Sequence, residues 1–188
     1  MSKELKERKI SQLFFWENFF PSKHNPDSLR ETLKKNFLFE DLTKSELRYL
    51  ERIVHLRSYD AGEFVFHQDE RALGMYIIVS GKVTVLVHSR DSSGLKAKDT
   101  LITTLGEGAF LGEHSLIEAD SRRTASTVAA EPTVLIAFLK PDLIDIVQRR
   151  PIMGLKITLQ LAKVLSTRLR KTTERLSELS HESEQQND

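Results

Sequence analysis

The sequence contains no cysteine, which excludes disulfide bonds, thiol catalysis and thiolate metal sites. It also has almost no net charge, since 28 basic and 27 acidic residues give a formal net charge of +1. Without a global positive field, direct binding to DNA or to an anionic membrane is not expected. No apolar run approaches the ~20 residues that are needed to cross a bilayer, so we expect no transmembrane segment.

The N-terminus starts with the positive charge of a signal peptide, but polar residues interrupt residues 11–23 and no small-residue cleavage site follows. We therefore expect a cytoplasmic protein. What the sequence does contain, 39% hydrophobic and 29% charged residues in a chain of 188, is typical of one folded domain with helical extensions.

Helical patterns occupy the start of the chain. Apolar residues recur at helical spacing over residues 4–20, and a short second helix is predicted around 28–36, so we assign 1–36 to an N-terminal helical extension. Four of the ten phenylalanines and the only tryptophan cluster there: Phe14, Phe15, Trp16, Phe19 and Phe20. If exposed, such a cluster marks an interface, and the alternative is that it packs on the domain or across a dimer.

The apolar period changes to two over residues 56–138, where glycines recur as tight turns require. Short strands at this spacing predict a mainly β domain at 37–150, an antiparallel sandwich or barrel. A capping box, Thr43 with Glu46, opens a helix before the first strand. The polar stretch 88–100 is predicted to be a hairpin loop.

Five segments occur in order in the β-rich region: 59–63 (YDAGE), 67–70 (HQDE), 76–83 (YIIVSGKV), 112–116 (GEHSL) and 123–125 (RTA). In this order and at this separation they resemble a cyclic-nucleotide-binding domain over about residues 37–178. The resemblance implies a jelly-roll β-barrel with N-terminal helices and a long C-terminal helix. It also implies that the protein senses a cyclic nucleotide.

The resemblance implies that the guanidinium of Arg123 binds the cyclic phosphate through its planar donor fork. Glu113 matches the position that accepts the ribose 2′-hydroxyl proton, and it would also neutralise Arg123. Gly112 precedes a turn whose backbone groups would donate to the phosphate together with those after Arg123. These donors are expected on His114, Ser115, Thr124 and Ala125, with the Thr124 hydroxyl as a further candidate. The base is expected near Arg168 and Leu169 of the last helix.

The sequence departs from the family pattern at two turns. Asp69 stands where the family often has Gly, and Asp tolerates the left-handed conformation such a turn needs. Arg122 stands where Pro is frequent, so Arg122 or Arg123 could be the phosphate arginine; Arg123 aligns better, since Thr and Ala follow it. The hydroxyl of Thr124 occurs both in cGMP-binding channels and in bacterial cAMP sensors. We expect cAMP, with cGMP as the alternative.

A long helix is predicted from about Pro151, with 151–180 as a lid or dimerisation helix and 181–188 as a frayed tail. Its residues at alternating spacings of three and four form a coiled-coil seam: Ala162, Leu165, Leu169, Thr172, Leu176 and Leu179. Bacterial relatives dimerise through this helix, so we expect a parallel homodimer; the alternative is a lid that packs back on the barrel. Only nine residues follow the seam, too few for the DNA-binding domain of those relatives.

We therefore expect a single-domain regulatory module that senses cAMP, or cGMP, and passes its signal to an unidentified protein effector. The histidines lack metal-ligand spacing and no second carboxylate or nucleophile accompanies Glu113 and Arg123, so we expect neither a metal nor enzymatic activity. The alternative is a nucleotide-free scaffold or protein–protein interaction module with the same fold.

Overall fold

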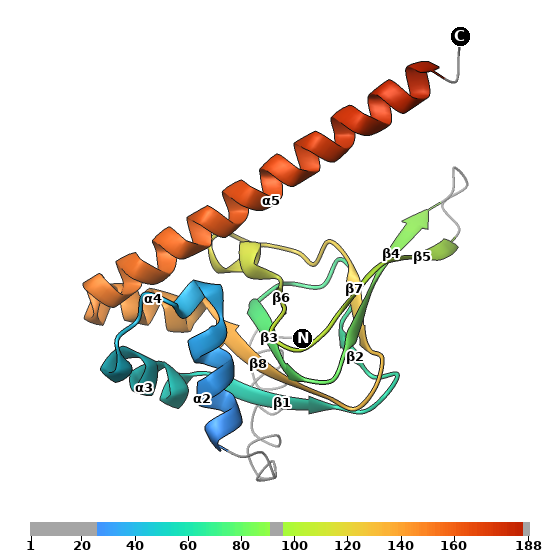
Figure 1. Ribbon diagram of the computed structural model, residues 1–188. Helices are drawn as coiled ribbons and strands as arrows, with labels where there is room; N and C mark the ends of the chain where they lie inside the picture. The colour runs from blue at the N-terminus through green and yellow to red at the C-terminus, as the bar shows by residue number, and fades with distance from the viewer. Residues whose placement is uncertain (1–25, 91–95, 186–188) are drawn as a thin grey trace, which may run out of the picture.

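The computed structural model describes residues 26–90 and 96–185. Its body consists of two sheets with helices packed on one side, and a long helix extends away from that body (Figure 1). The helix expected over residues 4–20 and its aromatic cluster lie outside the described residues. None of the described helices is both long and apolar enough to cross a membrane.

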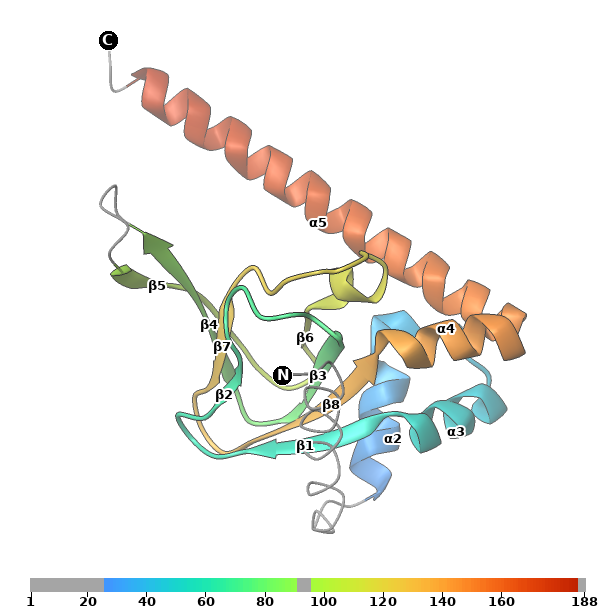
Figure 2. The ribbon, with the colours of Figure 1, turned by 180° about the vertical axis from the view of Figure 1, so that it is seen from behind.

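The two four-stranded sheets have the orders β1-β8-β3-β6 and β2-β7-β4-β5, and their strands pair in antiparallel fashion. They form an open jelly-roll sandwich rather than a closed barrel (Figure 2). The expected mainly β class with flanking helices is therefore confirmed. The strands are β1 (His55–Tyr59), β2 (Phe64–Phe66), β3 (Gly74–Ser80), β4 (Val83–Arg90), β5 (Lys96–Leu105), β6 (Phe110–Leu111), β7 (Ser126–Ala129) and β8 (Thr133–Leu139).

The first sheet is buried on both faces, because it lies between the helices and the second sheet. Alternate side chains of β8 consequently enter different apolar clusters, as the period of two in a strand requires. The cluster under the helices takes Val134, Ile136 and Phe138. Leu135 enters the cluster between the sheets, together with Ile78, Val83 and Leu111.

The helical elements are α2 (Pro26–Lys35), η2 (Phe37–Phe39), α3 (Lys44–Ile53), η3 (Glu113–Leu116), α4 (Lys140–Arg149) and α5 (Pro151–Gln185). The first half of α5 packs on the core through one face, formed by Met153, Ile157, Leu161 and Val164. From residue 166 to residue 178 the helix is exposed on all sides, and it continues beyond Leu179, where the sequence predicts its end.

The β4–β5 hairpin is longer than the apolar pattern indicates. The sequence predicts a loop at 88–100, but His88 pairs with Asp99 and Arg90 pairs with Lys96. Backbone hydrogen bonds form between the two strands whatever their side chains are. The polar outer part of the hairpin therefore cannot be predicted from a pattern of apolar residues.

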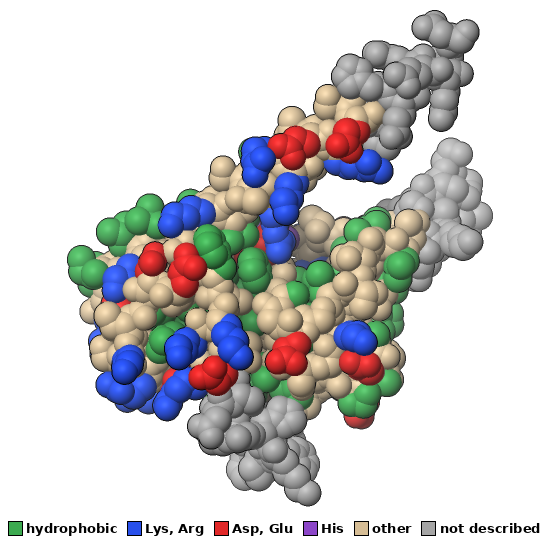
Figure 3. Space-filling model, in the orientation of Figure 1, with side chains coloured by type: hydrophobic (Ala, Val, Ile, Leu, Met, Phe, Trp, Pro, Cys, Tyr) green, Lys and Arg blue, Asp and Glu red, His purple; other side chains and the backbone are tan. Residues whose placement is uncertain are grey.

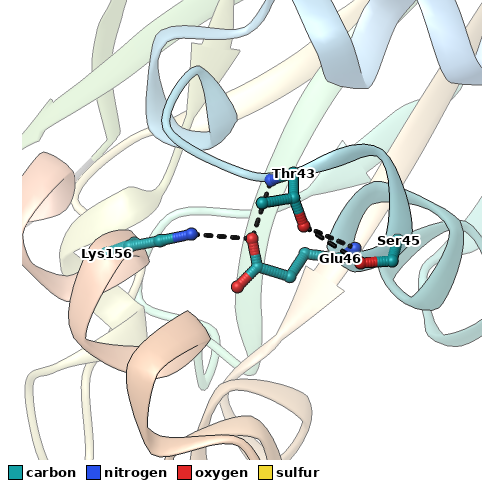
Figure 4. Close-up of polar contacts among 4 residues, drawn as sticks. All are labelled: Thr43, Ser45, Glu46 and Lys156. Carbon is teal, nitrogen blue, oxygen red and sulfur yellow. Dashed lines mark hydrogen bonds and ion pairs between the residues drawn. The ribbon is translucent and has the colours of Figure 1, made fainter.

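The capping box of α3 also connects α3 to α5 through an ion pair (Figure 4). Thr43 Oγ1 accepts from the Glu46 amide at 3.3 Å, and Glu46 Oε2 accepts from the Thr43 amide at 2.7 Å. The same Glu46 oxygen lies 2.8 Å from Lys156 Nζ on α5. One turn further along α5, the buried Gln160 Nε2 donates to Glu40 at 2.9 Å and to Asp41.

We expect Glu46→Gln to lower the free energy of unfolding by about 1 kcal/mol at neutral pH, because the Lys156 bond loses its charge. Burial raises the pKa of Glu46, but hydrogen bonds from Lys156 and Thr43 outweigh it and hold the pKa below its ordinary 4.5. A carboxyl whose pKa is depressed on folding stabilises the protein above its unfolded pKa, and this contribution disappears as pH falls through the folded pKa.

Urea unfolding at neutral pH and at acidic pH checks this. The difference between wild type and Glu46→Gln should shrink as pH falls below about 4.5. Glu107→Gln, in an exposed turn, is the matched control and should show little change at either pH. A Glu46→Gln deficit that does not vary with pH would contradict the assigned ion pair.

Candidate ligand-binding site

A pocket of about 320 Å³ lies against the second sheet and is bordered by β6, η3 and one residue of α5. This volume lies at the lower end of the range typical of small-molecule sites. Its apolar wall comes mainly from strands, through Phe66, Val85, Leu105, Phe110 and Leu111. Its polar lining consists of Thr103, His114, Arg123, Thr124, Thr127 and Arg168.

The turn after β2 fixes the backbone of Arg123. The Arg123 amide donates to the Glu70 carbonyl, and the Asp69 amide donates to the Arg123 carbonyl, both at 2.8 Å. Asp69 adopts the left-handed conformation, with φ of 68°. Arg122 is exposed and donates to the Asp69 carbonyl at 2.7 Å. Of the two neighbouring arginines, therefore, Arg123 is the one that lines the pocket.

Arg123 is 4% exposed, and its guanidinium lies over two aromatic rings. Its central carbon is 4.1 Å from the centre of the Phe66 ring and 5.4 Å from that of Tyr76. Burial lowers the pKa of Arg123, with Tyr76 and Glu70 opposing the shift. Nε and Nη1 have no hydrogen-bond partner among the described residues. A buried cation with two unused donors makes this pocket suited to an anion.

Glu113 pairs with Arg168 of α5 and not, as the sequence suggests, with Arg123. The Glu113 side chain is 3% exposed, and its Oε1 lies 2.7 Å from Arg168 Nη1. Arg168 also donates to the Phe110 carbonyl at 3.2 Å and lies over the Phe110 ring at 5.1 Å. The second oxygen, Glu113 Oε2, is buried without a partner in the described part of the chain.

Gly112 joins β6 to η3 in the left-handed conformation, with φ of 75°. A Cβ at Gly112 would also collide with the guanidinium of Arg123. Both the backbone conformation and the lack of space therefore favour glycine here. The Ser115 amide and hydroxyl both donate to the Gly112 carbonyl, at 3.2 Å and 2.6 Å. These bonds stabilise the turn and occupy the two donors of Ser115, one of the four residues that were expected to donate to a ligand.

The remaining predicted residues separate into two groups. Those that line the pocket are Gly112, His114, Arg123, Thr124, Ala125 and Arg168. Those that are not among the lining residues are Glu113, Ser115 and Leu169, of which Leu169 is 69% exposed. On a helix, successive residues point about 100° apart, so two neighbours cannot both face one pocket squarely.

Sequence reasoning missed the strand residues of the pocket, such as Phe66, Val85 and Thr127. Period-two alternation shows which side chains share a face, but it does not show which stretch of that face remains open. Among the residues that the structure describes, no group of three His, Asp or Glu side chains is placed to hold a metal ion.

A sequence profile of the cyclic nucleotide-binding domain matches residues 56–150. The chain is 30% identical over 150 residues to the cyclic AMP receptor protein of Thermus thermophilus, covering 80% of this chain and 65% of that protein. It is 32% identical over 120 residues to a cAMP-activated global transcriptional regulator of Haemophilus influenzae, covering 63% of this chain and 51% of that protein. A solved cyclic nucleotide-binding domain from Methylobacillus flagellatus gives a TM-score of 0.66 at 25% identity, covering 80% of this chain and 81% of that one.

The chain spans between about half and two thirds of the length of these two curated relatives. The profile match covers half of this chain and contains every strand from β2 to β8. It also contains the buried charges of Arg123, which lines the pocket, and of Glu113, which adjoins the lining residues Gly112 and His114. The chain therefore belongs to the cyclic nucleotide-binding domain family.

Proposed function

We propose that the pocket binds a 3′,5′-cyclic nucleotide, cAMP with cGMP as the alternative, and that the protein is a non-enzymatic regulatory module. The observation that carries this proposal is the buried guanidinium of Arg123, whose Nε and Nη1 lack partners among the described residues. A cyclic phosphate is a monoanion whose two free oxygens accept charge-assisted hydrogen bonds from such donors.

Glu113 supplies the complementary acceptor. Arg168 holds Oε1, and Oε2 remains available to accept the ribose 2′-hydroxyl. Charge-assisted hydrogen bonds of this kind are about twice as strong as neutral ones, so Arg123 and Glu113 supply most of the polar affinity. Thr124 follows Arg123 at the exposed rim of the pocket, where its hydroxyl and amide reach the phosphate.

The choice of cAMP rests on the relatives, since the Thermus and Haemophilus proteins are both named for cAMP. The Thr124 hydroxyl keeps cGMP as the alternative, because a hydroxyl at this place also suits a guanine amino group. Titration with both nucleotides separates the two.

Arg168 links the pocket to α5, the helix that extends from the body (Figure 1). A ribose hydroxyl bound at Glu113 alters the charge environment of the Arg168–Glu113 ion pair. Any resulting displacement of Arg168 moves α5, which also holds α3 through Lys156 and Glu46. We propose this helix as the route by which ligand binding reaches a protein effector.

Arg123→Gln is expected to weaken nucleotide binding by about 10- to 150-fold, which corresponds to one charge-assisted hydrogen bond of ~1.5–3 kcal/mol. Glu113→Gln should weaken it in the same direction. Isothermal titration with cAMP and cGMP measures both effects. Arg122→Gln is the matched control, because this neighbouring side chain is exposed and lies outside the pocket lining.

Thermal unfolding provides a second readout. A nucleotide at a hundredfold excess over its dissociation constant should stabilise the wild type by about 2.7 kcal/mol. A wild type that shows neither saturable heat nor thermal stabilisation with millimolar cAMP or cGMP would reject the sensor and leave a scaffold. Conversion of cAMP to 5′-AMP would instead show an enzyme.

We further propose that α5 pairs with a second copy of the chain through its exposed face. Residues on this face alternate at spacings of three and four: Ile152, Leu155, Leu159, Ala162, Ser166, Leu169, Thr173 and Leu176. Hydrophobic side chains gather on the surface where α4 and the start of α5 meet (Figure 3). Leu165 packs partly on the protein's own core, so the seam runs through Ser166 in its place.

The lid alternative is not favoured by the described residues, because α5 is exposed from residue 166 to residue 178. In this assignment residues 37–150 bind nucleotide and residues 151–180 form the dimer helix. The five large apolar side chains on the seam, each more than half exposed, are what a partner helix would cover: Ile152, Leu155, Leu159, Leu169 and Leu176.

Leu159→Glu and Leu169→Glu are expected to dissociate the dimer without unfolding the protein, since both side chains are more than half exposed. Sedimentation velocity at tens of micromolar measures the change from dimer to monomer. Lys171→Glu is the control, because it alters an exposed residue off the seam. A wild type that sediments only as a monomer would refute the dimer.

A further inference from the structure

Two polar atoms in the pocket have no role in the binding of phosphate or ribose described above. Thr127 Oγ1 and His114 Nε2 are both inaccessible to solvent and have no hydrogen-bond partner among the described residues. Both residues line the pocket, and Thr127 is only 1% exposed. Buried polar side chains are normally paired, so two unpaired ones in one pocket require an explanation.

Thr127 lies on β7 in the middle of the apolar wall. It is paired in register with Phe66 of β2 and with Val85 of β4, and both of these neighbours also line the pocket. A valine would fill the same space without burying a hydroxyl. The wall therefore carries a polar group at a position where packing alone favours an apolar one.

The preceding residue of the same strand shows the contrast. Ser126 is completely buried, and its hydroxyl accepts from the Gln68 amide at 2.9 Å and lies 2.9 Å from His88 Nε2. Successive residues of a strand face opposite sides, so Ser126 points away from the pocket and finds protein partners. Thr127 points toward the pocket, and any partner for its hydroxyl must come from there.

His114 is the second residue of η3 and follows Glu113 directly. It lines the pocket with Phe110 and Arg168, and thus belongs to the η3 and α5 side, whereas Thr127 belongs to the sheet. Which ring nitrogen carries the proton depends on the tautomer, so Nε2 can donate or accept. The hydroxyl of Thr127 can do both as well.

Arg123 and Glu113 account for the phosphate and the ribose of a cyclic nucleotide, and for the base only the Thr124 hydroxyl has been assigned a hydrogen bond, to the amino group of guanine. If Arg123 takes the phosphate and Glu113 the 2′-hydroxyl, the base edge still carries ring nitrogens and an exocyclic group. We infer that Thr127 and His114 hydrogen-bond to the base and thereby determine which nucleotide the pocket accepts. This inference rests on the proposed function and adds the residues that select the base.

The test combines variants that remove each polar group with a probe that lacks the base. Thr127→Val and His114→Leu are titrated with cAMP, with cGMP and with 1-deoxyribose 3′,5′-cyclic phosphate. We expect each variant to lose about 3- to 10-fold in affinity for the preferred nucleotide, as for one neutral hydrogen bond, and to bind the baseless probe as the wild type does. Without nucleotide, Thr127→Val should melt at or above the wild-type temperature, because it removes an unpaired buried hydroxyl.

Thr84→Val is the matched control. It makes the same chemical change on β4, next to Val85, at a residue outside the pocket lining. Its nucleotide affinities should equal those of the wild type.

Two results would overturn the inference while leaving the proposed function intact. The first is an affinity for cAMP and cGMP that is unchanged in both variants. The second is a loss of affinity for the baseless probe as large as the loss for the nucleotides, which would mean that Thr127 and His114 contact the sugar or the phosphate. A wild type that binds none of the three probes would overturn the proposed function, and this inference with it.

Discussion

The guanidinium of Arg123 is a charge buried in the interior, and several neighbouring features are arranged around it. Asp69 holds the left-handed turn that fixes its backbone, Gly112 leaves out the Cβ that would collide with it, and Phe66 supplies an aromatic face. Burial of an ion without a counter-charge costs several kcal/mol. Because Glu113 is engaged with Arg168, the pocket is built to recover part of that cost from a bound anion.

Helix α5 connects features that lie far apart in the sequence. Its buried face is part of the core, Lys156 and Gln160 reach the acidic groups around α3, and Arg168 reaches Glu113. Lys156 and Arg168 are twelve residues apart, so about 18 Å of continuous helix separates the two ion pairs. A helix is stiff over this length, which is the physical reason for proposing α5 as the route between the pocket and α3. The profile match ends at residue 150, one residue before α5 begins.

Local chemistry predicted much of this arrangement. The period of two and the capping box at Thr43 follow from short-range patterns, and the structure agrees with both. The family resemblance favoured Arg123 over Arg122, and of the two only Arg123 lines the pocket. The pairing of distant residues was not predictable: Glu113 pairs with Arg168, 55 residues away. Nor was the outer end of the β4–β5 hairpin, where the strands pair without an apolar period. The seam proposed on α5 differs in phase from the seam that the sequence predicts, for a related reason. Leu165 fits a heptad, but packing against the core decides which face of the helix stays exposed.

The exposed seam of α5 is apolar near the core and partly polar farther out, and this difference would affect where a second helix binds it most weakly. Leu155 and Leu159 form an apolar stretch near the core, whereas Ser166 and Thr173 interrupt the seam on either side of Leu169. Polar residues at seam positions reduce the stability of a coiled coil, so the outer half of the proposed pairing would be the weaker half. Arg168, the residue that meets Glu113, lies within this weaker half. In the proposed dimer, a small change in free energy at the pocket would therefore act where the association of the two helices is most easily shifted.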